Sequence, residues 1–256
     1  EIIYRINGEF LLEVERRWPH DDAAKSALSL IAEGYGRRVR MAHLAVVGSH
    51  KVNGVAKLHS ELVRKTVFAG FAALYPERFT NVTNGITVRR WLKQSNPGLS
   101  QLLTERLGAA WENDLEELER LVGSAEDPEF RARFRDIKLA NKRRLVAEID
   151  ARTGLDVSLH SLFDVQVKRI HEYKRQLLNL LYVVTRYQRI RANPQLDVVP
   201  RTVMFAGKAA PGYFLAKLII RLINNVATVI NQDPVTQGKL ACVFLPDYDV
   251  SLAQKI

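Results

Sequence analysis

Positively charged side chains gather in one short part of the chain, residues 168–176, called here the basic segment. It reads Lys-Arg-Ile-His-Glu-Tyr-Lys-Arg-Gln and follows an apolar run over residues 162–167. Four of its side chains can donate hydrogen bonds to an anion. A helix that begins here would add unpaired backbone NH groups at the positive end of its dipole. The basic segment therefore predicts a phosphate site where a strand passes into a helix. The four donors are Lys168, Arg169, His171 and Lys174.

The chain as a whole is basic, with a formal net charge of +10 over 256 residues. Its hydrophobic content of 47% is enough for a substantial core, in one large or two modest domains. A basic protein can bind nucleic acid, an acidic membrane surface or a phosphorylated ligand. Outside the basic segment, however, the cations are scattered among acids, which is typical of solvated helix faces. Charge alone therefore does not favour nucleic acid.

The single cysteine, Cys242, lies in the apolar run 240–245. That setting predicts a buried, unreactive thiol, and one cysteine excludes a disulfide within the chain. No apolar run approaches the roughly 18 residues that span a membrane, and the first residues do not resemble a signal peptide. We expect a reducing, cytoplasmic setting and no membrane partner.

The first part of the chain is predicted to be mainly helical, because apolar residues recur at helical spacing. The apolar stretch 39–47 is predicted to be a short strand. A polar stretch, residues 80–85, interrupts the helical pattern and is the best candidate for a domain junction. The expected helices cover about 3–14, 22–31, 58–71, 114–121 and 129–149.

From residue 161 apolar runs alternate with helical stripes, which predicts parallel βαβ units in a doubly wound sheet. Ligands of such sheets bind outside the carboxyl ends of the strands, where the basic segment lies. The small-residue turn, residues 207–213, follows the second strand and would let backbone approach a ligand closely. A tight turn between strand and helix explains its composition equally well. The expected strands are 162–167, 201–205 and 243–245, and the helices include 177–184 and 215–226.

The chain contains five blocks that matter together: residues 41–44, 48–56, 83–87 with 89–91, 168–176 and 207–213. In this order they resemble the glycogen and maltodextrin phosphorylase family. The resemblance implies an α/β fold, a two-domain Rossmann-like glycosyltransferase of GT-B type. Residues 1–84 would be the C-terminal end of its first domain, and residues 85–256 the beginning of its second, cofactor-binding domain. We therefore expect an internal fragment with a helical first half and an incomplete parallel βαβ sheet in its second half.

The resemblance also implies an activity, a cofactor and partners. Family members release glucose 1-phosphate from the ends of α-1,4-glucans with inorganic phosphate, and they require pyridoxal phosphate. The complete protein is therefore expected to be a cytoplasmic transferase of glycogen metabolism. It would bind an α-1,4-glucan and inorganic phosphate, form a homodimer, and need neither a metal nor a nucleic acid.

The resemblance assigns roles within the basic segment. Arg169 and Lys174 would contact the substrate phosphate and Lys168 the cofactor phosphate, while Tyr173 would reach a sugar hydroxyl. Two phosphates brought together repel strongly unless cations lie around them. Arg169 offers a planar fork for bidentate binding, whereas the lysines are compact point charges. Without the resemblance, ordinary helix-start and surface residues would be an equally good reading.

Three further residues match the family pattern. His50 and Asn84 would contact the sugar, since each can both donate and accept hydrogen bonds. A core histidine and a turn-forming Asn-Gly are the alternatives. Trp91 would pack near the cofactor, although an ordinary core tryptophan is the simpler interpretation. Val88 stands where relatives often have proline.

The lysine that forms a Schiff base with pyridoxal phosphate belongs, by the resemblance, to a later part of the second domain. No segment before Ile256 matches it, so the isolated chain is expected to be inactive. A noncatalytic carbohydrate-binding relative is one alternative. A basic nucleic-acid-binding module is another, although the chain lacks a basic face with interleaved aromatic residues.

Overall fold

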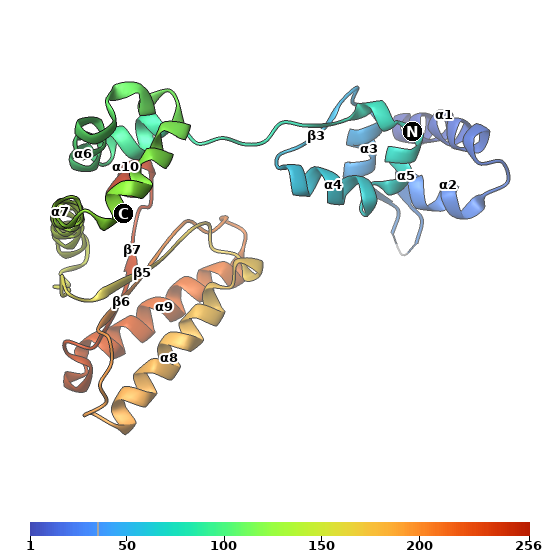
Figure 1. Ribbon diagram of the computed structural model, residues 1–256. Coiled ribbons are helices and arrows are strands. Elements are labelled where there is room, and N and C mark those ends of the chain that lie inside the picture. Colours follow the sequence, from blue (N-terminus) through green and yellow to red (C-terminus); the bar gives the residue numbers. More distant parts are fainter. Residues whose placement is uncertain (35) are drawn as a thin grey trace. The chain divides into compact units, whose positions relative to one another are not determined.

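The computed structural model describes residues 1–34 and 36–256 and divides into two compact units. Unit 1 covers Glu1–Ile86 and unit 2 covers Thr87–Ile256 (Figure 1). The division lies two residues beyond the predicted boundary between residues 84 and 85. Helices dominate both units, and each unit also contains parallel strand pairs. The fold is therefore of the mixed α/β kind.

Unit 1 is a small helical body with two pairs of short strands. β1 pairs with β2 antiparallel, and β3 pairs with β4 parallel. The rings of Phe10 and Phe71 stack 5.9 Å apart in its buried core, and Tyr75 is buried beside them. Its helices are α1 (Ile2–Arg17), α2 (Asp22–Leu28), α3 (Met41–Val47), α4 (Lys57–Lys65), α5 (Ala69–Leu74) and the 3-10 turn η1 (Pro76–Arg78); its strands are β1 (Ile31–Ala32), β2 (Arg38–Val39), β3 (Val52–Gly54) and β4 (Phe79–Asn81).

The predicted strand over residues 39–47 is wrong, because most of that stretch forms helix α3. A short apolar run does not by itself separate a strand from a helix. In this case Met, Ala and Leu favour a helix, and Val46 is buried in the core of unit 1. The guanidinium of Arg40, at the N-cap, donates to carbonyls at the end of α2, including Ser26 O at 2.8 Å. Helix α3 is thereby tied to α2.

Three other predicted helices differ in their bounds or type. The helix expected over 58–71 is divided into α4 and α5. The helix expected over 22–31 ends at Leu28, because the Ser29 hydroxyl bonds the backbone of Ile31, which lies in β1. The helix expected over 114–121 is a 3-10 helix, η4.

Unit 2 is built on a parallel sheet of three strands in the order β5-β6-β7. The three predicted strands and the two helices that connect them are confirmed. The strands are in register: Leu162 lies opposite Arg201, which lies opposite Leu240. The strands are β5 (Leu162–Val167), β6 (Arg201–Ala206) and β7 (Leu240–Leu245). The helices are α6 (Pro97–Leu107), α7 (Pro128–Thr153), α8 (Gln176–Ala192), α9 (Phe214–Gln232) and α10 (Val250–Lys255), with a π-helix, η2 (Arg89–Gln94), and the 3-10 segments η3 (Ala109–Glu112), η4 (Leu115–Glu126), η5 (Glu172–Lys174) and η6 (Pro234–Thr236).

Helices cover both faces of this sheet (Figure 1). Val203 and Phe205 of the central strand β6 pack with α8 and α9. The alternate residues, Met204 and Ala206, pack in the cluster that includes α7 and α10. All four are fully buried, as expected for the central strand of a parallel sheet. Both faces of this three-stranded sheet are therefore covered by helices, although the sequence predicted an incomplete sheet.

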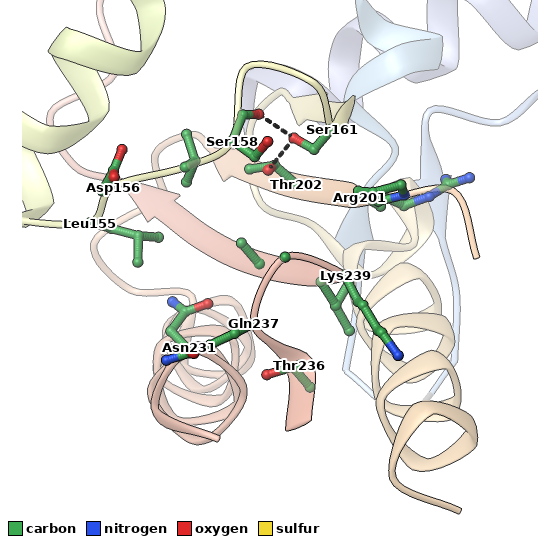
Figure 2. A pocket seen from close by; sticks show the side chains of 15 residues that line it. Leu155, Asp156, Ser158, Ser161, Arg201, Thr202, Asn231, Thr236, Gln237 and Lys239 are labelled. Atoms are coloured by element: carbon green, nitrogen blue, oxygen red, sulfur yellow. Dashed lines mark hydrogen bonds between the residues drawn. The ribbon is translucent and has the colours of Figure 1, made fainter. Parts of the chain in front are cut away.

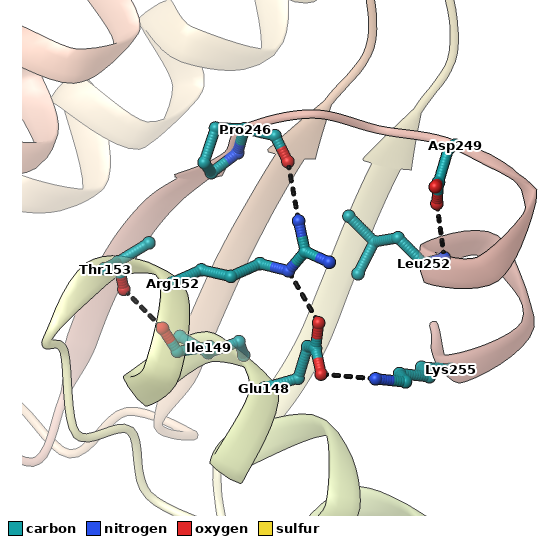
Figure 3. A network of polar contacts seen from close by, with 8 residues as sticks. All are labelled: Glu148, Ile149, Arg152, Thr153, Pro246, Asp249, Leu252 and Lys255. Carbon is teal, nitrogen blue, oxygen red and sulfur yellow. Dashed lines mark hydrogen bonds and ion pairs between the residues drawn. The ribbon is translucent and has the colours of Figure 1, made fainter.

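An ionic network fastens α10 to α7 (Figure 3). The carboxylate of Glu148 pairs with Lys255 at 2.5 Å and with Arg152 at 2.6 Å. Arg152 also donates to the Pro246 carbonyl at 3.3 Å. Lys255, followed by Arg152, lowers the pKa of Glu148 below its ordinary value. This carboxylate therefore links the two helices through its ion pairs.

One helix among the described residues, α9, is long and apolar enough to cross a membrane by length and composition. The prediction that no segment would meet this criterion was therefore wrong. The helix carries Lys217 and Arg221 on its exposed side and packs Ile219, Ile223 and Ile230 in the core of unit 2. These contacts are those of a helix that covers a sheet.

Candidate active site

The basic segment lies in unit 2, at the carboxyl end of β5, but its cations precede the helix instead of lying in its first turn. Helix α8 begins at Gln176, and residues 172–174 form a separate 3-10 turn. Arg175 has a left-handed backbone with φ 62°, which separates that turn from α8. The prediction of a helix that begins within the cluster of cations is corrected accordingly. The side chains of the loop, and not the helix start, carry the positive charge.

The cations of the basic segment have no acidic partner. Lys168 and Arg169 are exposed and Lys174 is half-buried. Within residues 1–34 and 36–256, none of the three forms an ion pair with a carboxylate. The Lys174 ammonium lies 5.7 Å from the centre of the Tyr173 ring. The positive charge is therefore not neutralised by the protein and is available to an anion.

The small-residue turn meets the basic segment at the same edge of the sheet. Val167 and Ala206 are register partners, so the two connections leave neighbouring strand ends. Ile170 N donates to Lys208 O at 3.2 Å. A Cβ atom at Gly207, whose φ is +147°, would lie 2.8 Å from the carbonyl carbon of Lys168 and closer still to its oxygen. Only glycine fits there, because the backbone of the basic segment lies against Gly207. The sequence had suggested only that a ligand would approach this backbone.

Backbone donors accompany the side-chain cations. In the described part of the chain, the NH groups of Arg169, Lys208 and Ala209 make no backbone hydrogen bond. Adjacent free NH groups of this kind bind anions through fixed partial charges. The site can thus offer an anion both charged side chains and main-chain donors.

Three aromatic rings and the carboxylate of Glu172 lie together at the basic segment. Tyr213 donates its hydroxyl hydrogen to the Glu172 carboxylate at 2.5 Å and accepts from the Glu172 backbone NH at 3.3 Å. The hydrogen bond to Glu172 raises the pKa of the Tyr213 phenol. The His171 ring lies 4.3 Å from the Tyr173 ring and 5.0 Å from the Tyr213 ring. The Glu172 carboxylate therefore bonds Tyr213 and, among the described residues, forms no ion pair with the neighbouring cations.

Two side-chain amides, one buried and one half-buried, hold the basic segment in place, and sequence analysis missed them. Gln176 is fully buried and bonds the backbone on both sides of Ile170. Gln166 bonds the carbonyl of Lys174. One signal for Gln176 is its position on the same helical stripe as Leu180, where a polar residue needs a partner.

Of the other residues predicted for the site, Trp91 lies apart from the basic segment and Tyr173 lies within it. Trp91 belongs to the π-helix η2 of unit 2 and is 40% exposed, so it is not a core tryptophan. No hydrogen bond or ring contact recorded for the described residues links it to the basic segment. Tyr173 is 70% exposed at the surface of that segment and can meet a ligand.

His50 and Asn84 lie in unit 1, and both are exposed. The exposure of His50 argues against the core-histidine interpretation. His50 precedes the amino end of β3, whereas Asn84 follows the carboxyl end of β4 and donates its backbone NH to Val55 O at 3.0 Å. Because β3 and β4 are parallel, the two residues flank opposite ends of this strand pair. The strand pair itself does not bring them together.

A cavity of about 210 Å³ lies at the opposite, amino end of the sheet (Figure 2). Ser161, Thr202 and Lys239 line it, and the first two share a hydrogen bond of 2.7 Å. It is smaller than most ligand pockets, which measure about 300–1,000 Å³. It contains none of the predicted site residues.

Comparison with known proteins identifies the family to which the chain belongs. A family model described as carbohydrate phosphorylase matches residues 1–256. The chain belongs to the carbohydrate phosphorylase family. Among its relatives, the glycogen phosphorylase of Synechocystis sp. is 52% identical and that of Chlamydia pneumoniae 51% identical, each over the whole chain. The muscle glycogen phosphorylase of Oryctolagus cuniculus is 48% identical. This phosphorylase chain spans about 30% of the length of these relatives (30%, 31% and 30%).

Proposed function

We propose that the complete protein cleaves terminal α-1,4-glucosidic bonds of glycogen or maltodextrin with inorganic phosphate and releases glucose 1-phosphate. The observation that carries this proposal is the basic segment, whose cations have no acidic partner in unit 2. Relatives named glycogen phosphorylase, at 48–52% identity, support the same reaction. In its activity the protein is thus an α-1,4-glucan phosphorylase, a glycosyltransferase.

Arg169 and Lys174 bind the substrate phosphate in this proposal. The guanidinium of Arg169 presents two parallel NH groups to two phosphate oxygens, and the Lys174 ammonium adds a point charge. Charge that develops between phosphate and sugar in the transition state is stabilised by these fixed cations. Their contribution is electrostatic and positional, and neither residue needs to change its protonation state.

The residues present fit the phosphate group of pyridoxal phosphate. Among residues 1–34 and 36–256, exposed Lys168 forms no ion pair, and the NH groups of Arg169 and Lys208 make no backbone hydrogen bond. Such a donor set suits a second anion beside the first. When bound, the cofactor supplies a reactive phosphate group. Lys168 holds that phosphate and Trp91, partly exposed in η2, packs near the cofactor.

His50 and Asn84 of unit 1, and Tyr173 of unit 2, are each proposed to contact sugar hydroxyl groups. The three are exposed, so their polar groups are free to meet hydroxyl groups. Residues 1–84 then form the end of the first domain of a GT-B glycosyltransferase, and residues 85–256 begin its cofactor-binding domain. The complete protein acts in the cytoplasm as a homodimer, without nucleic acid or membrane as partners.

The test is phosphate-dependent release of glucose 1-phosphate from maltodextrin by the purified complete protein, loaded with pyridoxal phosphate. The proposal expects release only when glucan, phosphate and cofactor are all present. Binding of maltodextrin without any release would identify a noncatalytic carbohydrate-binding relative instead. A complete protein with His50 and Asn84 replaced by alanine serves as a control, and it should lose apparent affinity for maltodextrin.

A further inference from the structure

Gln176 holds the backbone of the basic segment from within the core. Its side chain is fully buried. Its Nε2 donates to the Arg169 carbonyl at 3.0 Å, and its Oε1 accepts from the His171 NH at 3.3 Å. The peptide group between Arg169 and Ile170 is held at its other end too, because Ile170 N donates to Lys208 O. Two consecutive peptide groups beside Arg169 are therefore fixed.

Gln166 makes the equivalent contact at the other predicted phosphate-binding residue. It lies in β5, two residues before the basic segment, and its Nε2 donates to the Lys174 carbonyl at 3.0 Å. Its Oε1 accepts from Nδ2 of Asn179 in α8 at 2.9 Å, which fixes the direction of the amide. Arg169 and Lys174 thus each have their carbonyl held by one glutamine.

We propose that Gln176 and Gln166 are positioning residues that set the separation of Arg169 and Lys174 for the substrate phosphate. The inference rests on the proposed function of the complete protein. Neither glutamine touches the phosphate in this account. Each acts through the backbone of the residue that does.

The chemistry of the two contacts explains why glutamine is needed. The cations of the basic segment repel one another when no anion is bound. This repulsion favours a more open conformation of the loop. A peptide group that rotated would turn its carbonyl oxygen towards the phosphate and repel it. Bonding the carbonyl of Arg169 to buried Gln176 and that of Lys174 to half-buried Gln166 keeps both oxygens turned away. Burying an amide costs stability, and packing alone would not offset that cost. Here the amide hydrogen bonds also hold the carbonyl groups in place.

The test measures separate KM values for phosphate and for maltodextrin in the complete, cofactor-loaded protein. Gln176→Leu removes both hydrogen bonds while filling the core. Gln166→Met is of similar length and uncharged, but it can no longer donate to the Lys174 carbonyl or accept from Asn179. Asn231→Leu is the matched control, because Asn231 makes the same two-bond clamp on Cys242, at 2.7 and 3.0 Å, in another part of unit 2.

Both glutamine variants should raise the KM for phosphate about tenfold or more, because small displacements of positioned groups carry large kinetic costs. The KM for maltodextrin should stay near that of the unsubstituted protein, and Asn231→Leu should change neither. An unchanged KM for phosphate in Gln166→Met, or an equal rise in Asn231→Leu, would overturn the inference alone. If Gln176→Leu does not fold, Gln166→Met decides. Absence of phosphorolysis by the unsubstituted protein would overturn the proposed function and this inference together.

Discussion

Gly207→Ala should disrupt the phosphate site although no functional group is lost. The new Cβ would lie 2.8 Å from the Lys168 carbonyl carbon and closer to its oxygen, whereas real Cβ contacts stay above 3.0 Å. The φ of +147° adds backbone strain for any residue with a side chain. Strain and overpacking together should cost about 3 kcal/mol of unfolding free energy. The two connections must also separate, and a displacement of about 1 Å at a reacting group can cost on the order of 100-fold in rate.

The assay compares this variant with Gly212→Ala, in the same small-residue turn. A Cβ at Gly212 meets nothing within 4 Å, and its φ is not in the left-handed region. Gly207→Ala should lower the denaturant midpoint and raise the KM for phosphate in the complete protein, and Gly212→Ala should leave both nearly unchanged. Equal behaviour of the two variants would refute the reasoning that the Gly207 backbone must approach Lys168.

Three further predictions concern pH, thiol reactivity and the isolated chain. The lowered pKa of Glu148 means that its ion pairs stabilise the fold above the ordinary carboxyl pKa of about 4.3 and are lost as pH falls below it. The difference in thermal midpoint between the unsubstituted protein and Glu148→Gln should therefore shrink between pH 6 and pH 3, roughly across that range; a constant difference would contradict this. Burial raises the pKa of the Cys242 thiol to about 12, so iodoacetamide at pH 8 should label it only after unfolding; rapid labelling of the folded protein would be inconsistent with that burial. A polypeptide of residues 1–256 alone should release no glucose 1-phosphate, and any phosphate-dependent release by it would show that the chain holds a complete site.

The sequence predicted the fold best where a residue pattern is compatible with only one type of secondary structure. The strands over 162–167 and 201–205 were predicted closely, because apolar runs bounded by turn residues and alternating with helical stripes suit a buried parallel sheet. The prediction failed over 39–47, where a short apolar run suits either a strand or a helix and the core of unit 1 selects the helix.

The candidate site, like the fold, could be predicted only in part from the sequence. The charge and position of Lys168, Arg169 and Lys174 follow from residue types at the end of a strand. The geometry that holds them does not, because Gln176 meets Arg169 seven residues away only after Arg175 takes a left-handed backbone. Contacts of that kind depend on how separate segments pack, and spacing along the chain does not encode them.

The most direct test of the central claim is the KM for phosphate in Arg169→Lys, measured in the complete protein alongside the KM for maltodextrin. The substitution keeps the positive charge and removes the bidentate geometry. Loss of one charge-assisted hydrogen bond, worth about 1.5–3 kcal/mol, should raise the KM for phosphate roughly 10- to 100-fold and leave the KM for maltodextrin nearly unchanged. A normal KM for phosphate in this variant would contradict the claim that the basic segment binds the substrate phosphate.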